Sequence, residues 1–165
     1  MTVVSDSGPL IVLARVKLFP LTKALFERVL ISAEVYDEVT CAGERLPGGA
    51  ETRDADWIEV RRVVLPEDVT AAQSRFGLGV GELSTILLAK EVSADLILVD
   101  DLSARKLAVR QGFRVIGTVG LLQGCYRNGS LTDLRGAFLA MLAEGAYLDR
   151  GLLNRVLASL SLPAI

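Results

Sequence analysis

The chain has 165 residues, of which 51% are hydrophobic and 23% charged, and its formal net charge is −2. A length of this order is most simply one domain with a sizeable core, and the charge does not show the strongly basic character typical of many nucleic-acid-binding domains, although a local basic surface is still compatible with it. The sequence contains no histidine, which excludes Ser–His–Asp and Cys–His catalysis.

The sequence predicts a cytoplasmic protein without a membrane span. No apolar run reaches the ~18 residues of a transmembrane helix. The N-terminal MTVVSDSGPL has no basic region and contains Asp6, so it does not resemble a secretory signal. Cys41 and Cys125 are far apart, which makes a disulfide framework improbable.

Short apolar runs alternate with helical patterns along the first part of the chain. A β-branched run at 2–5 ends at Asp6, and Pro9 suits the first turn of the following helix. Ser32 is placed to cap a later helix with the sequence AEVYDEVT. The expected elements are a strand at 2–5, helices at 7–16 and 18–27, a strand at 28–31, a helix at 33–40, a loop at 41–49 and a strand at 57–65.

The same alternation continues to residue 127, and a longer amphipathic tail follows it. The expected elements are helices at 67–76 and 80–91, a strand at 96–99, a helix at 102–111, a strand at 113–116, a helix at 118–127 and a helical hairpin at 131–160 with its turn near 145–150. Strands that alternate with helices predict right-handed crossovers and a parallel α/β sheet of about five strands. We expect one domain over 1–165, with its core in 1–127.

Acidic residues occur at strand ends and helix starts. Asp6 follows the first strand, Asp100 and Asp101 follow the fourth, Glu82 opens a helix, and Glu38 lies at the margin of an apolar helical stripe. Taken alone, each has an ordinary explanation as a helix cap or a solvated side chain. Asp100 and Asp101 point to opposite sides of an extended chain, so one caps the next helix and the other faces the rim of the sheet; the sequence leaves both assignments open.

Acids at the carboxyl ends of parallel strands are expected to meet at one edge of the sheet. Their charges would repel one another and raise their pKa values, and a divalent cation relieves that repulsion. Oxygen ligands without histidine or cysteine suit Mg²⁺ or Mn²⁺. Such an ion can bring a water to a phosphodiester, help to deprotonate it and stabilise the leaving oxygen.

Three other nucleotide-related interpretations fit less well. LILVDD is similar to the strand that holds Mg²⁺ in P-loop NTPases, but the chain lacks the G-x-x-x-x-G-K-[ST] loop. GLGVGE has the rhythm of a dinucleotide-binding motif, yet it follows a helical pattern rather than a strand. A phosphoacceptor receiver domain would have its acidic pair after the first strand, where this chain has only Asp6.

Four motifs resemble the PIN-domain family of nucleases in their order and spacing: VVSDSGPL, VYDEV, GVGELSTILLAK and LILVDDLSARK. The similarity is to a PIN-like subfamily of prokaryotic proteins and, more loosely, to VapC-type toxins of toxin–antitoxin pairs. It covers 1–127, and the helical tail also resembles that subfamily. The resemblance implies a three-layer α/β/α fold and Mg²⁺- or Mn²⁺-dependent cleavage of single-stranded RNA, often by a homodimer. In toxin relatives an antitoxin segment blocks the pocket.

The resemblance also implies roles for individual acids. The first aspartate of the family corresponds to Asp6, the next acid to Glu38, the third to Glu82, and the fourth region to Asp100 and Asp101. We expect Asp6, Glu82 and one of the aspartate pair to bind the ion, with Glu38 binding a second ion or orienting water. The family often has aspartate where this chain has Glu82, which is one methylene longer.

Two further residues are candidates for contact with RNA, and one alternative function stays open. Ser7 corresponds to the hydroxyl beside the family's first aspartate, and Arg105 is placed to contact a phosphate with its bidentate fork. The alternative is a catalytically inactive PIN-like module that binds nucleic acid or protein. Leucines at helical spacing, as in 131–160, most often form a core, but they also suit a dimer face or an antitoxin-binding surface, and the sequence does not separate these.

Overall fold

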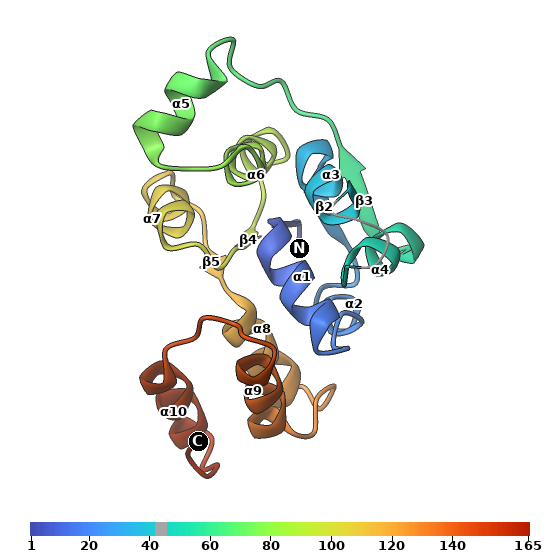
Figure 1. Ribbon diagram of the computed structural model, residues 1–165, viewed down its shortest axis with the longest axis vertical. Helices are drawn as coiled ribbons and strands as arrows, with labels where there is room; N and C mark the ends of the chain where they lie inside the picture. Colours follow the sequence, from blue (N-terminus) through green and yellow to red (C-terminus); the bar gives the residue numbers. More distant parts are fainter. Residues whose placement is uncertain (42–45) are drawn as a thin grey trace.

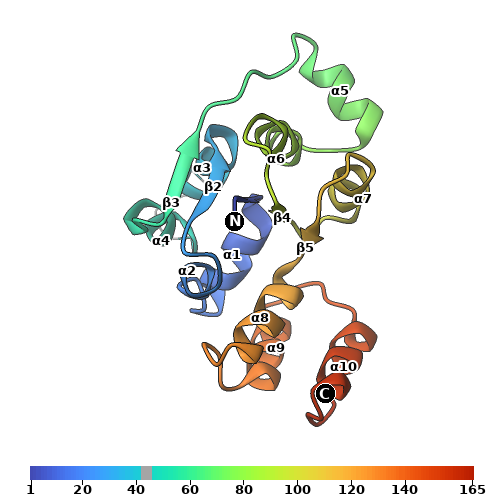
Figure 2. The ribbon, with the colours of Figure 1, turned by 180° about the vertical axis from the view of Figure 1, so that it is seen from behind.

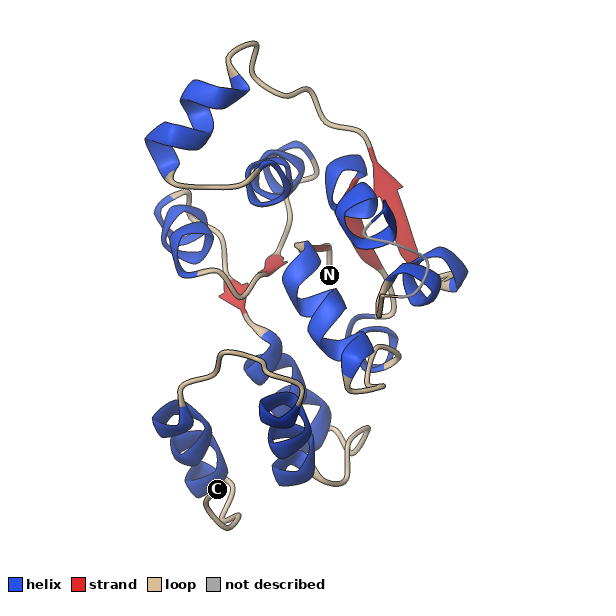
Figure 3. Cartoon of the chain, in the orientation of Figure 1, coloured by secondary structure: helices blue, strands red, loops and turns tan. Residues whose placement is uncertain are grey.

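A computed structural model describes residues 1–41 and 46–165, so the loop predicted at 41–49 lies partly outside the described residues. The strands form one parallel sheet in the order β3-β2-β1-β4-β5. They are β1 (Val3–Ser5), β2 (Val29–Ser32), β3 (Ile58–Arg61), β4 (Leu96–Leu98) and β5 (Val115–Ile116). Figure 3 shows that β4 and β5 are much shorter than the helices around them.

The helices follow the predicted alternation closely. They are α1 (Ser7–Arg15), α2 (Leu21–Phe26), α3 (Ala33–Cys41), α4 (Gly49–Asp54), α5 (Val69–Phe76), α6 (Val80–Glu91), α7 (Leu102–Arg110), α8 (Thr118–Arg127), α9 (Leu134–Ala143) and α10 (Arg150–Ser159). The predicted bounds of α6 and α8 are confirmed, whereas α4 was not predicted. Among the described residues, no helix has both the length and the apolar character needed to cross a membrane.

The strand predicted at 57–65 is wrong at its C-terminal end, because β3 stops at Arg61. β3 is an edge strand whose one neighbour is β2, and the last pair of their register joins Ser32 to Arg61. The chain of β2 turns into α3 directly after Ser32. Beyond Arg61, therefore, no partner strand is left to pair with the apolar residues that follow.

Alternate residues of the strands pack against different helix layers. Val3 and Leu98 face a cluster that includes side chains of α1, α2 and α8. Val4 and Ile97 face a second cluster with α6 and α7. This period of two, with apolar residues on both faces, is what a parallel sheet covered by helices requires. Figure 1 shows the resulting three-layer α/β/α arrangement, which confirms the predicted fold class.

The tail forms the predicted helical hairpin, in which α9 packs on α8 and α10 packs on α9. Figure 2 shows the hairpin at the end of the molecule opposite α5. Phe138, Met141, Leu153 and Leu157 are buried and belong to the same apolar cluster as β1. The hairpin therefore contributes to the core of the sheet rather than lying apart from it.

The strand order reverses between β1 and β4. The chain runs from β1 outward to β2 and β3, then returns to place β4 and β5 on the other side of β1. In open α/β sheets, ligands bind beyond the carboxyl ends of the strands at such a reversal. The residues that follow β1 and β4 are Asp6 and the sequence Val99, Asp100, Asp101.

Candidate functional site

Asp6 stands at the carboxyl end of β1, at the reversal of strand order. Ser5 pairs with Leu98 of β4, and the N–H of Asp6 donates to the Leu98 carbonyl at 2.9 Å. Helix α1 begins at the next residue, so Asp6 occupies its N-cap position with an extended backbone. Its side chain makes no capping hydrogen bond, however, so helix capping does not account for this carboxylate.

The carboxyl group of Asp6 is buried and incompletely paired. The residue is only 4% exposed, and its Oδ1 atom is buried without a hydrogen-bond partner. The pKa of Asp6 is raised from 3.8 to about 7, mainly by burial, with smaller contributions from the charges of Glu82 and Glu38. The backbone N–H groups of Ser7 and Gly8 lower this pKa, although the Asp6 side chain makes no capping hydrogen bond to α1. A buried, unpaired oxygen of this kind calls for a proton or a cation.

Glu38 extends from α3 toward the start of α1 and the first turn of α6. The hydroxyl of Ser7 donates to Glu38 Oε2 at 2.8 Å. The same carboxylate lies against Gly81, so closely that a Cβ atom at position 81 would overlap it. Ser7 and Gly81 therefore fix the position of a side chain that is otherwise exposed.

Glu82 lies in the first turn of α6, where the helix dipole favours a negative charge. Its carboxylate folds back over the N-cap residue Gly79, with Oε2 only 2.5 Å from where a Cβ atom of residue 79 would stand. The end of β2 is joined to α6 by a 2.7 Å hydrogen bond between the buried hydroxyls of Ser32 and Ser84, and α3 begins at the next residue. Glu38 of α3 and Glu82 of α6 are both close enough for their charges to act on Asp6.

Asp100 and Asp101 have different partners, which shows which of the two caps the following helix. Asp101 caps α7, because its Oδ1 accepts from the N–H of Ala104 at 2.8 Å. Asp100 accepts twice from the first residue of α8: Oδ1 from the Thr118 N–H at 2.7 Å and Oδ2 from its hydroxyl at 2.6 Å. Beside this pair, Nη1 of Arg105 donates to the Val99 carbonyl at 2.9 Å.

The structure thus brings the predicted acids together in two sets. The charges of Glu38 and Glu82 act on Asp6, whereas Asp100 and Asp101 are held by the starts of α8 and α7. Within residues 1–41 and 46–165, no three acidic, histidine or cysteine side chains already stand in positions to hold one metal ion. The metal-binding assignment of these acids therefore stays a prediction.

Two polar residues near these acids were not singled out from the sequence. Thr118 is fully buried and supplies both donors to Asp100. Its only sequence signal is a hydroxyl residue directly after a strand and a glycine. Glu34 lies one turn before Glu38 on α3, and its Oε2 atom is buried without a partner. The i, i+4 spacing of the two glutamates was the available signal.

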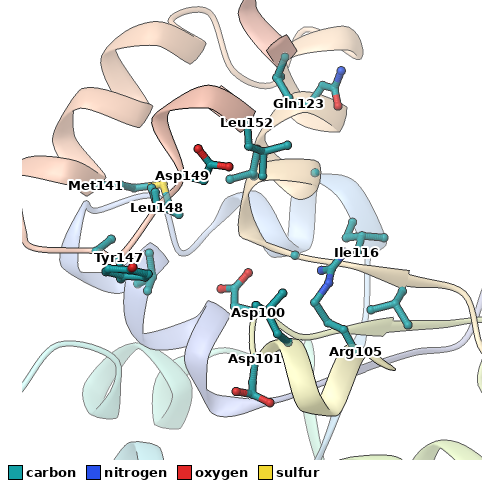
Figure 4. Close-up of a pocket in the computed structure, with 18 residues that line it drawn as sticks. Asp100, Asp101, Arg105, Ile116, Gln123, Met141, Tyr147, Leu148, Asp149 and Leu152 are labelled. Carbon is teal, nitrogen blue, oxygen red and sulfur yellow. The ribbon is translucent and has the colours of Figure 1, made fainter. Parts of the chain in front are cut away.

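A pocket of about 860 Å³ opens beside Asp100, between the carboxyl ends of β4 and β5 and the α9–α10 hairpin (Figure 4). Its walls are mainly apolar, and its polar lining consists of Asp100, Asp101, Arg105, Gln123, Tyr147 and Asp149. Sequence reasoning missed this pocket, because its two walls come from segments far apart in the chain.

One comparison with known proteins gives a family. The family model DUF3368, described as a PIN domain, matches residues 2–161. No curated protein matches the chain significantly. PIN domains are in general nucleases, so the resemblance seen in the four motifs is confirmed at the level of the family and its nuclease-type fold. With almost the whole chain matched, this protein belongs to the PIN-domain family.

Proposed function

We propose that the chain is a Mg²⁺- or Mn²⁺-dependent ribonuclease that hydrolyses phosphodiester bonds in single-stranded RNA. The observation that supports this most directly is the buried, unpaired Oδ1 of Asp6, beside two further carboxylates at the reversal of strand order. In a PIN domain, this is the place where an acidic site for nucleic-acid hydrolysis is expected.

The side chains around Asp6 fit a divalent cation. The donor atoms are all carboxylate oxygens, which hard ions such as Mg²⁺ and Mn²⁺ prefer. A cation would also satisfy the unpaired Oδ1 atom and offset the repulsion from Glu38 and Glu82. In the proposal, Asp6 and Glu82 hold the ion, and Asp100 or Asp101 supplies the third carboxylate.

A divalent ion supplies a bound water of lowered pKa and stabilises the oxygen that leaves the phosphorus. The chain itself positions the groups around that water. Glu38, held by Ser7, orients the water or takes part in a second ion site. Arg105 is anchored by one N–H group to the Val99 carbonyl, which leaves its other N–H groups for a phosphate of the strand.

Cleavage of single-stranded RNA by wild type and Asp6→Asn tests this proposal. We expect Mg²⁺- or Mn²⁺-dependent activity in wild type and a loss of about a hundredfold or more in Asp6→Asn, the scale on which single catalytic groups act. Asp37→Asn is the matched control, because Asp37 is an exposed acid next to Glu38. Equal activity of Asp6→Asn and Asp37→Asn would reject the assignment.

A second candidate is a PIN-like module that binds nucleic acid or a protein without cutting. It is favoured by the absence, among the described residues, of three acids already placed around one ion. It is also favoured by the two hydrogen bonds from Thr118, which already occupy both carboxylate oxygens of Asp100. Calorimetry distinguishes the two: the nuclease predicts saturable Mn²⁺ binding that is lost in Glu82→Gln, and the module predicts no such binding in either protein.

A narrower version of the first proposal is that the chain is the toxin of a toxin–antitoxin pair, acting as a homodimer in the cytoplasm. It is supported by the resemblance of the four sequence motifs to VapC-type toxins. It predicts a small neighbouring reading frame that encodes a DNA-binding protein. Induced expression of wild type alone should then arrest growth, whereas Asp6→Asn or co-expression of that neighbour should restore it.

A further inference from the structure

The pocket beside Asp100 has the features of a site for one flat, partly polar group. Apolar side chains from three segments form its walls, among them Ile116 of β5, Val119 of α8 and Leu152 of α10. Ligand sites of this kind are typically concave and mainly apolar, with a few polar groups that fix the orientation of the ligand. Its volume of about 860 Å³ is ample for a nucleobase with its sugar.

We propose that this pocket binds one unstacked nucleobase of the RNA strand whose phosphate lies at the acidic site. The inference rests on the proposed ribonuclease function and deepens it, because it assigns a place where the substrate's sequence is read. Asp100 joins the two places: it follows β4 at the reversal of strand order and also lines the pocket.

Tyr147 is the residue that favours a base over other flat ligands. It lies in the segment between α9 and α10, lines the pocket and is fully exposed. Figure 4 shows it near Leu148 and Met141, at the end of the pocket away from Arg105. Unstacked bases in single-stranded RNA are commonly bound on aromatic side chains, and every base has a face suited to such stacking.

The polar groups of the pocket suit the edge of a base rather than a phosphate. Asp149 caps α10 through Oδ1, which accepts from the Gly151 N–H at 2.7 Å, so that Oδ2 is left to accept from a ligand. Figure 4 shows Asp149 and Asp100 on opposite sides of the pocket. Carboxylates repel phosphate but accept from amino groups, which adenine, cytosine and guanine carry and uracil lacks. The pocket is therefore expected to prefer amino-bearing bases.

Arg105 lines one end of the pocket, where it is suited to a phosphate of the strand rather than to the base. Its guanidinium lies at the end opposite Tyr147, next to Asp100, and its remaining N–H groups are suited to phosphate oxygens. A basic peptide is the competing occupant, because three carboxylates on the wall would attract it. The positive charge of Arg105 and the exposed ring of Tyr147 favour the nucleotide.

Binding of labelled single-stranded oligoadenylate and oligouridylate, measured by fluorescence anisotropy with a chelator present, tests the proposal without requiring cleavage. We expect Tyr147→Ala to weaken oligoadenylate binding about tenfold, the scale of one stacked base. Tyr147→Phe keeps the ring and should stay within about twofold of wild type on the same argument. Phe76→Ala, which removes an exposed aromatic ring outside the pocket, should change nothing.

Asp149→Asn tests whether the carboxylate of Asp149 selects bases that carry an amino group. Asparagine caps helices as well as aspartate does, so α10 should be retained. It both donates and accepts, however, so the preference for oligoadenylate over oligouridylate should shrink or disappear. A preference that is unchanged in Asp149→Asn would overturn this part of the proposal.

Other outcomes are equally decisive. Oligoadenylate binding that is the same in Tyr147→Ala and wild type would overturn the base site. So would binding of an arginine-rich peptide that depends on Tyr147 when no RNA binds. Equal affinity for adenosine monophosphate and oligoadenylate would assign the pocket to a free nucleotide and not to a strand. The two proposals fail separately. If Asp6→Asn cleaves RNA as well as wild type, the ribonuclease proposal fails, whereas the base site still predicts a loss of oligoadenylate affinity in Tyr147→Ala.

Discussion

Asp6 carries a carboxyl group that titrates differently in the folded and the unfolded chain. Its pKa is raised from 3.8 to about 7 by burial, with the charges of Glu82 and Glu38 adding to the effect. Between those pH values the folded protein binds more protons than the unfolded chain, so the free energy of unfolding should fall as the pH rises from 4 to 7 and level off above it. At 1.36 kcal/mol per pKa unit, this contribution is at most about 4 kcal/mol.

Urea denaturation of wild type and Asp6→Asn at pH 4, 6 and 8 measures this contribution. Asparagine does not ionise, so the variant should gain stability relative to wild type as the pH rises, and the gain should end near pH 7. Mn²⁺ at pH 8 should stabilise wild type more than Asp6→Asn, because a cation offsets the charge that burial disfavours. A stability difference that does not vary with pH would show that Asp6 ionises as an ordinary surface carboxyl.

At the scale of helices, the contact between α3 and α6 depends on the missing side chain of Gly81. A Cβ atom there would overlap the carboxylate of Glu38, which must then leave Ser7 and the neighbourhood of Asp6. Gly81→Ala should keep the helix, since alanine favours helix over glycine by about 1 kcal/mol. It should nevertheless weaken Mn²⁺ binding by about tenfold or more, as changes around metal ligands commonly do.

Calorimetry with Mn²⁺ and thermal denaturation of the same samples check this expectation. Gly120→Ala on α8 is the matched control, because a Cβ atom there would make an ordinary 3.5 Å contact with Ile116. It should bind Mn²⁺ like wild type. If Gly81→Ala also binds Mn²⁺ like wild type and remains folded, Glu38 takes no part in the site.

The elements that the sequence predicts well are those defined by a local pattern. The helix at 80–91 and the strands follow from helical patterns that alternate with short apolar runs, and the position of Asp6 follows from its place after a buried strand. The partner of Asp100 does not follow from a local pattern. Thr118 lies 18 residues further along the chain and is brought to Asp100 by the packing of α8 after β5. The pocket depends on packing between segments still farther apart, and no local pattern encodes which surfaces meet.

At the scale of the whole molecule, the tail and the sheet share one apolar cluster. Leu157 of α10 and Val3 of β1 belong to it, as does Phe19, whose ring lies 5.9 Å from that of Trp57. Trp57 is the single tryptophan of the chain, and its Nε1–H donates to the Thr22 hydroxyl at 2.9 Å. Its fluorescence therefore reports on the region around α2 and β3, away from the C-terminal hairpin.

If the chain unfolds as one cooperative unit, a cavity in the C-terminal hairpin must lower the unfolding midpoint that Trp57 fluorescence reports. Leu157→Ala removes a fully buried side chain and should lower the free energy of unfolding by about 2–5 kcal/mol. The midpoints followed by Trp57 fluorescence and by far-ultraviolet circular dichroism should fall together, because small domains usually unfold in one transition. Leu139→Ala on α9, which truncates an exposed leucine, should leave both midpoints nearly unchanged. An early loss of helical signal in Leu157→Ala, with the fluorescence midpoint unmoved, would instead show that the hairpin unfolds by itself and that the predicted single domain is wrong.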